Sequence, residues 1–524
     1  MSKAAEMAKV SAKGGFHLLW GLVASTIISS VGTIFIGNIL GDAQYGLYTI
    51  ALVAPNLISS FRDWGIVTAM IKYTAQYNAE DTREKIRSIF AASIVFEIVM
   101  GLALSIVSFA LSDFLATLYN NVALAPLIQI ASLSILTGAL LGTAQSAFVG
   151  TERMELNSIT LILQSIVKTA IILLLVILGM GPLGAVIGYS AGLLIAGIAG
   201  VLLMWVLYRK LPKPAGNKLE ILATTKTMLR YGLPLSIAAI ITGFQIQFYA
   251  FILPIFAASA LIGNYQIATT FVILITFFAT PITTIMFPAF SKLDAKKDHE
   301  TLKNVFQYSV KYASLLVVPT AAIVMVLAKP GIDVLFPEKY SAAPLFLVLL
   351  AANQLLAAAG SLSVGNLLNG QGQTRFNMKL SVLSAVIGFP LSIVLISQFG
   401  VIGLIVTVIV AAIPSLIIGL FWLKKHYDVT VDWSSSVRII LSGAIASAVT
   451  YFLVTWLDLS NWLTLLIGTI VFLVMFVLAA LLTRAVNRED LRNLRNMLGG
   501  LGPLRRPISF FLNILEKLMD TFRL

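Results

Sequence analysis

Charged residues and cysteine are scarce in this sequence. Charged residues make up 11% of the 524 residues, whereas a soluble domain usually carries about 25%. Because cysteine is absent, disulfides, thiolate nucleophiles and cysteine-based metal sites are excluded. The three histidines, His17, His299 and His426, lie far apart in the sequence, and we predict no metal site. Neither a GxGxxG nor a GxxxxGK(S/T) motif occurs, so no nucleotide or other cofactor is expected.

Long apolar runs dominate the sequence instead. Hydrophobic residues make up 58% of it, and the mean hydropathy is +0.94. A single soluble core would show short apolar stretches broken by charge, so the composition predicts an all-α integral membrane protein that crosses the bilayer many times. Too few residues lie outside the apolar runs to form a folded soluble domain, which argues against most enzymes.

The apolar runs predict about 14 transmembrane helices, because about 20 apolar residues of helix span a bilayer core. Six fall in the first half of the chain, at about 15–40, 45–71, 88–111, 123–149, 156–178 and 183–208. Eight follow, at about 231–256, 262–289, 305–327, 342–368, 377–397, 401–423, 437–457 and 462–483.

The basic residues predict the orientation, because Lys and Arg accumulate in cytoplasmic loops. With both termini in the cytoplasm, 32 of the 36 basic residues lie inside, and Lys329 and Lys339 lie outside. The net charge of +13 is therefore a sign of topology, and we predict no nucleic-acid partner. We expect a multi-pass protein in the plasma membrane of a prokaryotic cell.

Short motifs recur in the same order in the two halves of the chain, which indicates an internal repeat. The matches are Gly46-Leu-Tyr-Thr-Ile-Ala with Gly263-Asn-Tyr-Gln-Ile-Ala, displaced by 217 positions; Ile66, Thr68 and Met70 with Ile282, Thr284 and Met286, displaced by 216; Gly181-Pro-Leu-Gly with Gly400-Val-Ile-Gly, displaced by 219; and Gly150 and Arg153 with Gly372 and Arg375, displaced by 222.

The repeat unit holds six predicted helices, so both copies enter the membrane from the same side and are parallel. We therefore predict two six-helix lobes with a cavity between them, which is a transporter architecture. The predicted parts are an N-lobe at 1–208, a cytoplasmic linker at 209–230, a C-lobe at 231–423, two additional helices at 424–483 and an amphipathic cytoplasmic tail at 484–524.

Several motifs resemble those of a known family. Leu40-Gly-Asp-Ala-Gln-Tyr-Gly-Leu-Tyr, followed by Asp63-Trp-Gly, is similar to the opening of the polysaccharide transporters. These are the O-antigen-type flippases of the multidrug/oligosaccharidyl-lipid/polysaccharide (MOP) exporter superfamily. Tyr340-Ser-Ala-Ala and Gly370-Gln-Gly-Gln-Thr-Arg resemble motifs of its second lobe. The resemblance implies a fold like that of the multidrug and toxin extrusion (MATE) transporters, and movement of lipid-linked oligosaccharide to the outer leaflet by alternating access.

One position departs from this family. Its members often carry an Asp in the seventh span, where this chain reads Phe244-Gln-Ile-Gln-Phe-Tyr. Gln245 or Gln247 takes that place, so the resemblance implies no ionisable group there.

Four charged residues fall near the centres of predicted spans, where a charge costs about 2.5–3.5 kcal/mol on insertion scales. The lipid-linked sugar implied by the resemblance carries a phosphate or diphosphate, which Arg62 and Lys168 are suited to bind. Asp63 and Glu97 are candidates for coupling transport to an ion or proton. The alternative for all four is structural. Glu97 would pair with Arg62 or with Lys168, and Asp63 would pair with Lys168 or cap backbone groups.

Amide and hydroxyl side chains are our candidates for contacts to sugar, although helix–helix packing uses the same groups. The candidates are Asn56, Gln245, Gln247, Tyr249, Asn353 and Gln354.

Taken together, these features predict a flippase for polyprenyl- or dolichyl-(di)phosphate-linked oligosaccharide that serves cell-surface glycan assembly and has no catalytic residues. Its expected partners are that substrate, membrane lipids and glycan-assembly enzymes, and we expect a monomer. A cation-coupled MATE-type drug exporter is the main alternative. A membrane-embedded glycan polymerase is a further one, but the longest predicted outer loop, about 328–341, contains no histidine.

Overall fold

The structure is a computed structural model that describes residues 3–212, 220–294 and 297–498, together with 513, 516–517 and 519–520. The described residues form helices and no strand. Eight helices are long and apolar enough to cross a membrane, and a bent pair makes a ninth. The prediction of an all-α, multi-pass membrane protein is therefore confirmed, while the number of 14 spans stays a prediction.

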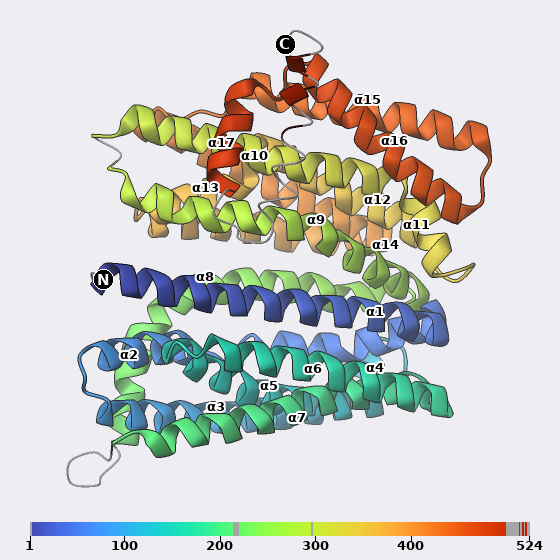
Figure 1. The fold of residues 1–524 in the computed structure, drawn as a ribbon. Coiled ribbons are helices and arrows are strands. Elements are labelled where there is room, and N and C mark those ends of the chain that lie inside the picture. The colour runs from blue at the N-terminus through green and yellow to red at the C-terminus, as the bar shows by residue number, and fades with distance from the viewer. Residues whose placement is uncertain are drawn as a thin grey trace. The chain divides into compact units, whose positions relative to one another are not determined.

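Figure 1 shows the helices of the described chain in order from the N-terminus to the C-terminus. In the first half they are α1 (Lys3–Ser59), α2 (Ile66–Ala79), α3 (Glu84–Ala110), α4 (Ser112–Leu118), α5 (Leu124–Gly150), α6 (Met154–Leu175), the π-helix η1 (Val176–Met180), α7 (Gly181–Lys210) and α8 (Ile221–Phe256). Then come α9 (Ser259–Lys292), α10 (His299–Val326), α11 (Ala328–Leu335), α12 (Ala343–Gln354), the 3-10 helix η3 (Leu355–Ala359), α13 (Ser361–Gly370), α14 (Thr374–Tyr427), α15 (Trp433–Leu457), α16 (Asn461–Leu482) and α17 (Arg488–Leu498).

Glycine breaks divide the helices that are too long for one span. Three apolar helical stretches are roughly twice as long as a bilayer needs. They are His17–Ser59 with 43 residues, Met154–Lys210 with 57 and Thr374–Tyr427 with 54. Each contains a glycine with non-helical backbone angles: Gly41 in α1, Gly179 in η1 and Gly400 in α14. Gly181, the first residue of α7, has φ 54° and ψ −136°, and Gly400 has φ 56° and ψ −126°. The repeated glycines therefore adopt the same conformation, one that favours glycine.

The repeat is also visible in packing. Gly150 at the end of α5 packs against Thr74, and Gly370 at the end of α13 packs in the same way against Phe290. The residues that follow show which positions of the two repeats are equivalent. Glu152 and Gly372 both have positive φ, and α6 and α14 each begin two residues after them. The displacement here is thus 220 positions, and the predicted displacement of 222 is wrong.

The second predicted span is interrupted. The sequence predicts a continuous helix over 45–71, but α1 ends at Ser59 and α2 begins at Ile66. Gly65 has φ 87°, and Asp63 and Gly65 lie in the non-helical connection. A continuous apolar run does not reveal such a break, because hydropathy depends on side chains and not on backbone angles.

The described chain forms two compact units. Unit 1 combines residues 1–267 with 339–341 and 381–411, and unit 2 combines 268–338, 342–380 and 412–524. In unit 1, Phe90 and Phe148 lie in a buried core with Met70. In unit 2, Phe306 and Leu367 lie in one core and Phe472 in another. The predicted lobe boundaries stay a prediction, and parts of the predicted linker and tail lie outside the described residues.

Candidate functional site

Arg62 lies in unit 1, in the connection between α1 and α2, and its side chain is 14% exposed. Its Nε lies 3.1 Å from Oε2 of Glu97 on α3. Its Nη1 donates a hydrogen bond to the carbonyl oxygen of Ile135 on α5 at 3.4 Å. The guanidinium thus joins the helix break to two neighbouring helices, and the predicted alternative of an ion pair with Glu97 is what the structure contains.

Glycines make room for the guanidinium on α5. Gly138 and Gly142 lie one turn apart, and a Cβ atom at either would reach within 3.5 Å of Nη1 or Nη2 of Arg62. The guanidinium therefore lies over bare backbone. Among the described residues, Nη2 has no hydrogen-bond partner, so part of the planar donor fork is unused.

Glu97 is the most deeply buried member of this cluster. Its side chain is 1% exposed. In the described part of the chain, neither carboxylate oxygen receives a properly oriented hydrogen bond, and the Nε–H of Arg62 is not directed at the oxygen beside it. The interaction is therefore a charge contact at 3.1 Å without hydrogen-bond geometry. A buried carboxylate in this state depends on one neighbouring cation, so Glu97 is sensitive to any ligand that draws Arg62 away.

Asp63 caps the break. Its Oδ1 accepts hydrogen bonds from the backbone N–H groups of Gly65 at 2.9 Å and Val67 at 3.2 Å. These are donors at the start of α2 that the helix itself leaves unsatisfied. The backbone-capping alternative is therefore present for Asp63, and a pair with Lys168 is not found among the described contacts.

Lys168 belongs to a different set of contacts. Its Nζ donates to Oγ of Ser29 on α1 at 3.2 Å, and Ser29 in turn donates to Ser165 at 3.2 Å. Among the described residues, no carboxylate lies within 4 Å of this ammonium. Gly192 of α7 lies tightly against the stem of the lysine. Lys168 is thus a half-buried cation in a predicted span whose contacts are hydroxyl groups.

The candidate sugar residues on α8 serve the helix packing in part. Nε2 of Gln245 donates to the hydroxyl of Tyr249 at 2.6 Å and to the carbonyl oxygen of Ser384 on α14 at 3.2 Å. Both side chains are buried, whereas Gln247 is half-buried. Asn56 is half-buried near the end of α1.

Asn353 and Gln354 end α12 in unit 2. There the chain passes through η3 to Gly360, which has φ 89°, and α12–η3 and α13 are bent by 49°. Both side chains are half-buried, and Oδ1 of Asn353 is buried without a hydrogen-bond partner in the described chain. The bend therefore contains a buried amide oxygen whose hydrogen-bonding capacity is unused in the described chain.

The turns that contain the matching motifs at Gly46 and Gly263 contact each other within unit 1. The sequence motifs alone did not predict this contact. A Cβ atom on Gly46 would lie 1.8 Å from the carbonyl oxygen of Ser259, and one on Gly263 would lie 2.1 Å from that of Asp42. Positions 46 and 263 differ by 217, as do 42 and 259. The contact is therefore reciprocal, as a pseudo-twofold axis requires. Asn264 extends it by donating to Asp42 at 3.5 Å.

A second connection on unit 1 involves the segment at 339–341. Tyr340 is almost fully buried, donates from its hydroxyl to the carbonyl oxygen of Gly37 at 3.0 Å, and lies edge-on to Tyr45. Lys339 donates to the carbonyl oxygen of Asn38. Lys339 is one of the two basic residues predicted outside, so these contacts lie on the predicted outer side. The sequence marks Tyr340 as part of a motif but does not predict its contact with Gly37.

The comparison with known proteins identifies the family. Residues 35–345 match the polysaccharide biosynthesis protein family, which is more than half of the chain. The chain belongs to this family. It is 24% identical over 413 residues to the lipopolysaccharide biosynthesis protein WzxC of Escherichia coli K12, covering 78% of this chain and 80% of that protein. It is 20% identical over 498 residues to an uncharacterized membrane protein of Methanocaldococcus jannaschii, covering 91% and 96%. The resemblance predicted from the motifs is thereby confirmed.

Solved structures show the same fold. The lipid II flippase MurJ in an inward closed conformation superposes with a TM-score of 0.69 at 15% identity, covering 88% of this chain and 98% of that one. An inward-facing MATE multidrug transporter of the MOP superfamily superposes with a TM-score of 0.58 at 15% identity, covering 77% and 94%. The chain therefore has the same all-α fold as these two proteins.

Proposed function

We propose that this protein is a flippase that moves a phosphate- or diphosphate-linked oligosaccharide lipid from the cytoplasmic to the outer leaflet of the plasma membrane. Family membership supports a role in polysaccharide biosynthesis, and the relative from Escherichia coli has a lipopolysaccharide role in its name. Arg62 gives the proposal its main support, because this largely buried arginine of a predicted span has an unused side of its donor fork.

Arg62 is suited to the phosphate because guanidinium binds phosphate oxygens through two parallel N–H groups. One edge of it is occupied by Glu97 and Ile135, and Nη2, over Gly142, offers the donors for the substrate. Lys168 is our second candidate, since its ammonium is half-buried and lacks a carboxylate partner in the described chain. A dianionic or trianionic headgroup gains from both cations when it leaves water.

Glu97 competes with the substrate for Arg62. An anionic phosphate on the guanidinium weakens the single charge contact that Glu97 has, and protonation of the carboxyl group then removes the unpaired buried charge. Release of the substrate restores the Arg62–Glu97 pair and releases the proton. Glu97 is therefore our leading candidate for ion coupling. Asp63 is the weaker one, because its Oδ1 already receives two backbone N–H groups.

The sugar contacts we propose differ in strength. Asn353, with its unsatisfied Oδ1, has the strongest support, and its neighbour Gln354 lies at the same bend. Gln247 and Asn56 are half-buried amides with no hydrogen bond from their side chains to described residues. Gln245 and Tyr249 bond to each other, so their proposed role is to position α8 against α14.

Alternating access accounts for the contacts on the predicted outer side. The reciprocal Gly46 and Gly263 contacts and the Tyr340–Gly37 bond close that side within unit 1. For cargo to leave toward the outer leaflet, these contacts must separate. We propose that the protein works as a monomer in this cycle, supplied by cytoplasmic glycan-assembly enzymes.

The test is mass spectrometry of lipid-linked glycans in cells depleted of the protein. Accumulation of a finished lipid-linked oligosaccharide after depletion is the expected result, and the accumulated species identifies the cargo. An unchanged pool in cells that lack other members of the family would contradict the proposal.

A MATE-type exporter of cationic compounds is the second candidate, because the fold is shared with that group at a TM-score of 0.58. Such a substrate needs free carboxylates. Glu97 is next to Arg62 and Asp63 caps α2, which favours an anionic substrate at this site. Hypersensitivity of depleted cells to cationic drugs with a normal glycan pool would favour the exporter.

A further inference from the structure

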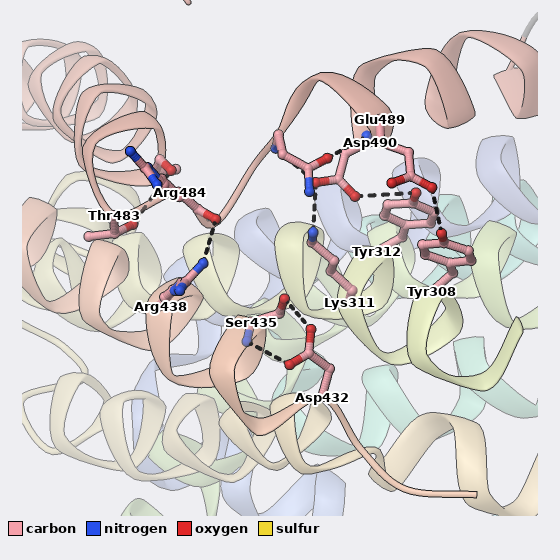
Figure 2. Close-up of polar contacts among 12 residues, drawn as sticks. Tyr308, Lys311, Tyr312, Asp432, Ser435, Arg438, Thr483, Arg484, Glu489 and Asp490 are labelled. Carbon is pink, nitrogen blue, oxygen red and sulfur yellow. Dashed lines mark hydrogen bonds and ion pairs between the residues drawn. The ribbon is translucent and has the colours of Figure 1, made fainter. Parts of the chain in front are cut away.

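Unit 2 contains a polar cavity of about 350 Å³ that is separate in its residues from the Arg62 cluster. Its walls come from α10, the start of α15, the segment after α16, and the start of α17 (Figure 2). All of these lie on the side predicted to be cytoplasmic. Three basic and three acidic side chains line it: Lys311, Arg438, Arg484, Asp432, Glu489 and Asp490.

Lys311 and the three acids are satisfied by one another or by neighbours. Lys311 lies 2.6 Å from Oδ2 of the almost completely buried Asp490. The hydroxyl of Tyr308 donates to Glu489 at 2.9 Å. Asp432 caps α15 by accepting from the backbone N–H of Ser435 at 3.2 Å. These groups build the wall of the cavity, and Asp490 is the one acid of the three that has a cation within 4 Å among the described residues.

Arg438 and Arg484 are different. Nη1 of Arg438 donates to the backbone carbonyl of Arg484 at 3.4 Å, which holds the two residues side by side (Figure 2). Both side chains are exposed, and neither contacts a carboxylate among the described residues. Arg484 has φ 56° and belongs to the left-handed turn that ends α16, where the backbone N–H of Ala485 donates to the carbonyl oxygen of Ala480 at 2.9 Å. Two exposed arginines without a carboxylate partner among the described residues, beside a polar cavity, suggest an anionic ligand.

The surroundings indicate what that ligand is. Arg438 lies in the second turn of α15, next to exposed Val437, and Arg484 comes two residues after exposed Leu482 at the end of α16. Exposed apolar side chains on helices of this length face acyl chains. Trp433, at the start of α15, is exposed at the level where aromatic residues mark the membrane interface. The arginines therefore lie at the depth of lipid phosphates.

The geometry points to a site for the phosphate of a membrane phospholipid at Arg438 and Arg484. The guanidinium groups bind the phosphate, the polar headgroup enters the cavity toward Glu489, and the acyl chains lie along the apolar surfaces of α15 and α16. The site is independent of the cargo proposed above, because its residues are not those of the Arg62 cluster.

The experiment is native mass spectrometry of the full-length protein in detergent, with phosphatidylglycerol and phosphatidylethanolamine added as probes. We expect the wild type to retain one phospholipid, and the R438Q/R484Q variant to retain about 10- to 30-fold less. The matched control is Arg488→Gln, which removes an exposed arginine that pairs with Asp520 in the nearby tail and leaves retention unchanged. R438K/R484K keeps the charge without the fork and falls between the two.

Two outcomes would overturn the inference. Equal retention of lipid by wild type and by R438Q/R484Q, both monodisperse in gel filtration, would show that the arginines do not hold a lipid. Displacement of the lipid by millimolar inorganic phosphate would show that the site takes free phosphate and that the apolar surfaces contribute nothing.

Discussion

The Nε atom of Arg62 lies 3.1 Å from Oε2 of Glu97, and this contact joins the break between α1 and α2 to the middle of α3. Arg62 and Glu97 lie in the second and third predicted membrane spans. The carboxylate has no other cation within 4 Å in the described chain. We propose two separable roles for the pair, one in stability and one in substrate binding. Single and double variants of the pair can separate the effect on stability from the effect on substrate binding.

Arg62→Ala should destabilise the protein by about 3–5 kcal/mol, because it leaves the buried charge of Glu97 without a partner. The R62A/E97Q variant should recover most of this stability, since no unpaired charge remains. It should still reduce flipping about 10- to 100-fold, because the phosphate has lost its charged hydrogen bonds. Thermal unfolding in detergent and the leaflet distribution of the glycan lipid measure the two effects.

Arg153→Ala is the control for this pair, because Arg153 forms an exposed pair with Glu155 and should leave both measurements near wild type. Full flipping by a stably folded R62A/E97Q variant would contradict a role of Arg62 in binding.

We expect a cross-link between the two turns on the predicted outer side to block transport. The side chains of Asp42 and Asn264 approach to 3.5 Å, and the natural chain has no cysteine to interfere. Oxidation of a D42C/N264C variant should stop flipping, and reduction should restore it, because the two turns can no longer separate.

A second cysteine pair controls for cross-linking itself. Ser132 donates to Ser108 at 2.8 Å between α5 and α3, within one predicted lobe. A cross-link in S108C/S132C should leave flipping unchanged. Normal flipping by fully cross-linked D42C/N264C would rule out alternating access through this contact.

The Lys311–Asp490 pair attaches the tail to α10. Asp490 also forms a reciprocal cap with Asn487 at the start of α17, each accepting from the other's backbone N–H at 2.8 Å. Asp490→Ala should therefore cost about 3–5 kcal/mol for the uncompensated lysine and about 1 kcal/mol for the cap. Melting temperatures of D490A and of the K311M/D490N variant measure this, and the double variant should be the more stable. A D490A variant that melts like wild type would contradict the assignment.

The lowered pKa of Asp432 predicts that the stability of the protein depends on pH. Partial burial alone would raise the pKa of Asp432, but hydrogen bonds from the hydroxyl and backbone N–H of Ser435 and the charge of Lys311 together lower it. Stability from the charged cap is therefore complete above the ordinary pKa of the carboxyl group and is lost as the pH falls through the lowered one. The melting temperature of wild type should exceed that of Asp432→Asn by a constant margin from pH 7 to about pH 5, and the margin should close below about pH 4. A margin that closes between pH 7 and pH 5 would contradict this.

Hydropathy and motif order were sufficient to predict the fold class and the family, because long apolar runs and repeated glycines are written directly in the sequence. The equivalence of Gly181 and Gly400 was predicted and appears in their backbone angles. The break at residues 60–65 was not, since an apolar run is equally compatible with a helix and with a capped connection. The partner of Glu97 was left open between two cations, because charge alone does not specify geometry. Asp490 was missed as the partner of Lys311, since 179 positions separate them.

The most direct test of the central claim is the leaflet distribution of the lipid-linked glycan in depleted cells that express either wild type or the R62A/E97Q variant at equal levels. We expect wild type to restore the glycan to the outer leaflet, whereas with the variant the glycan stays on the cytoplasmic side. Equal restoration by both would show that Arg62 does not hold the phosphate during transport.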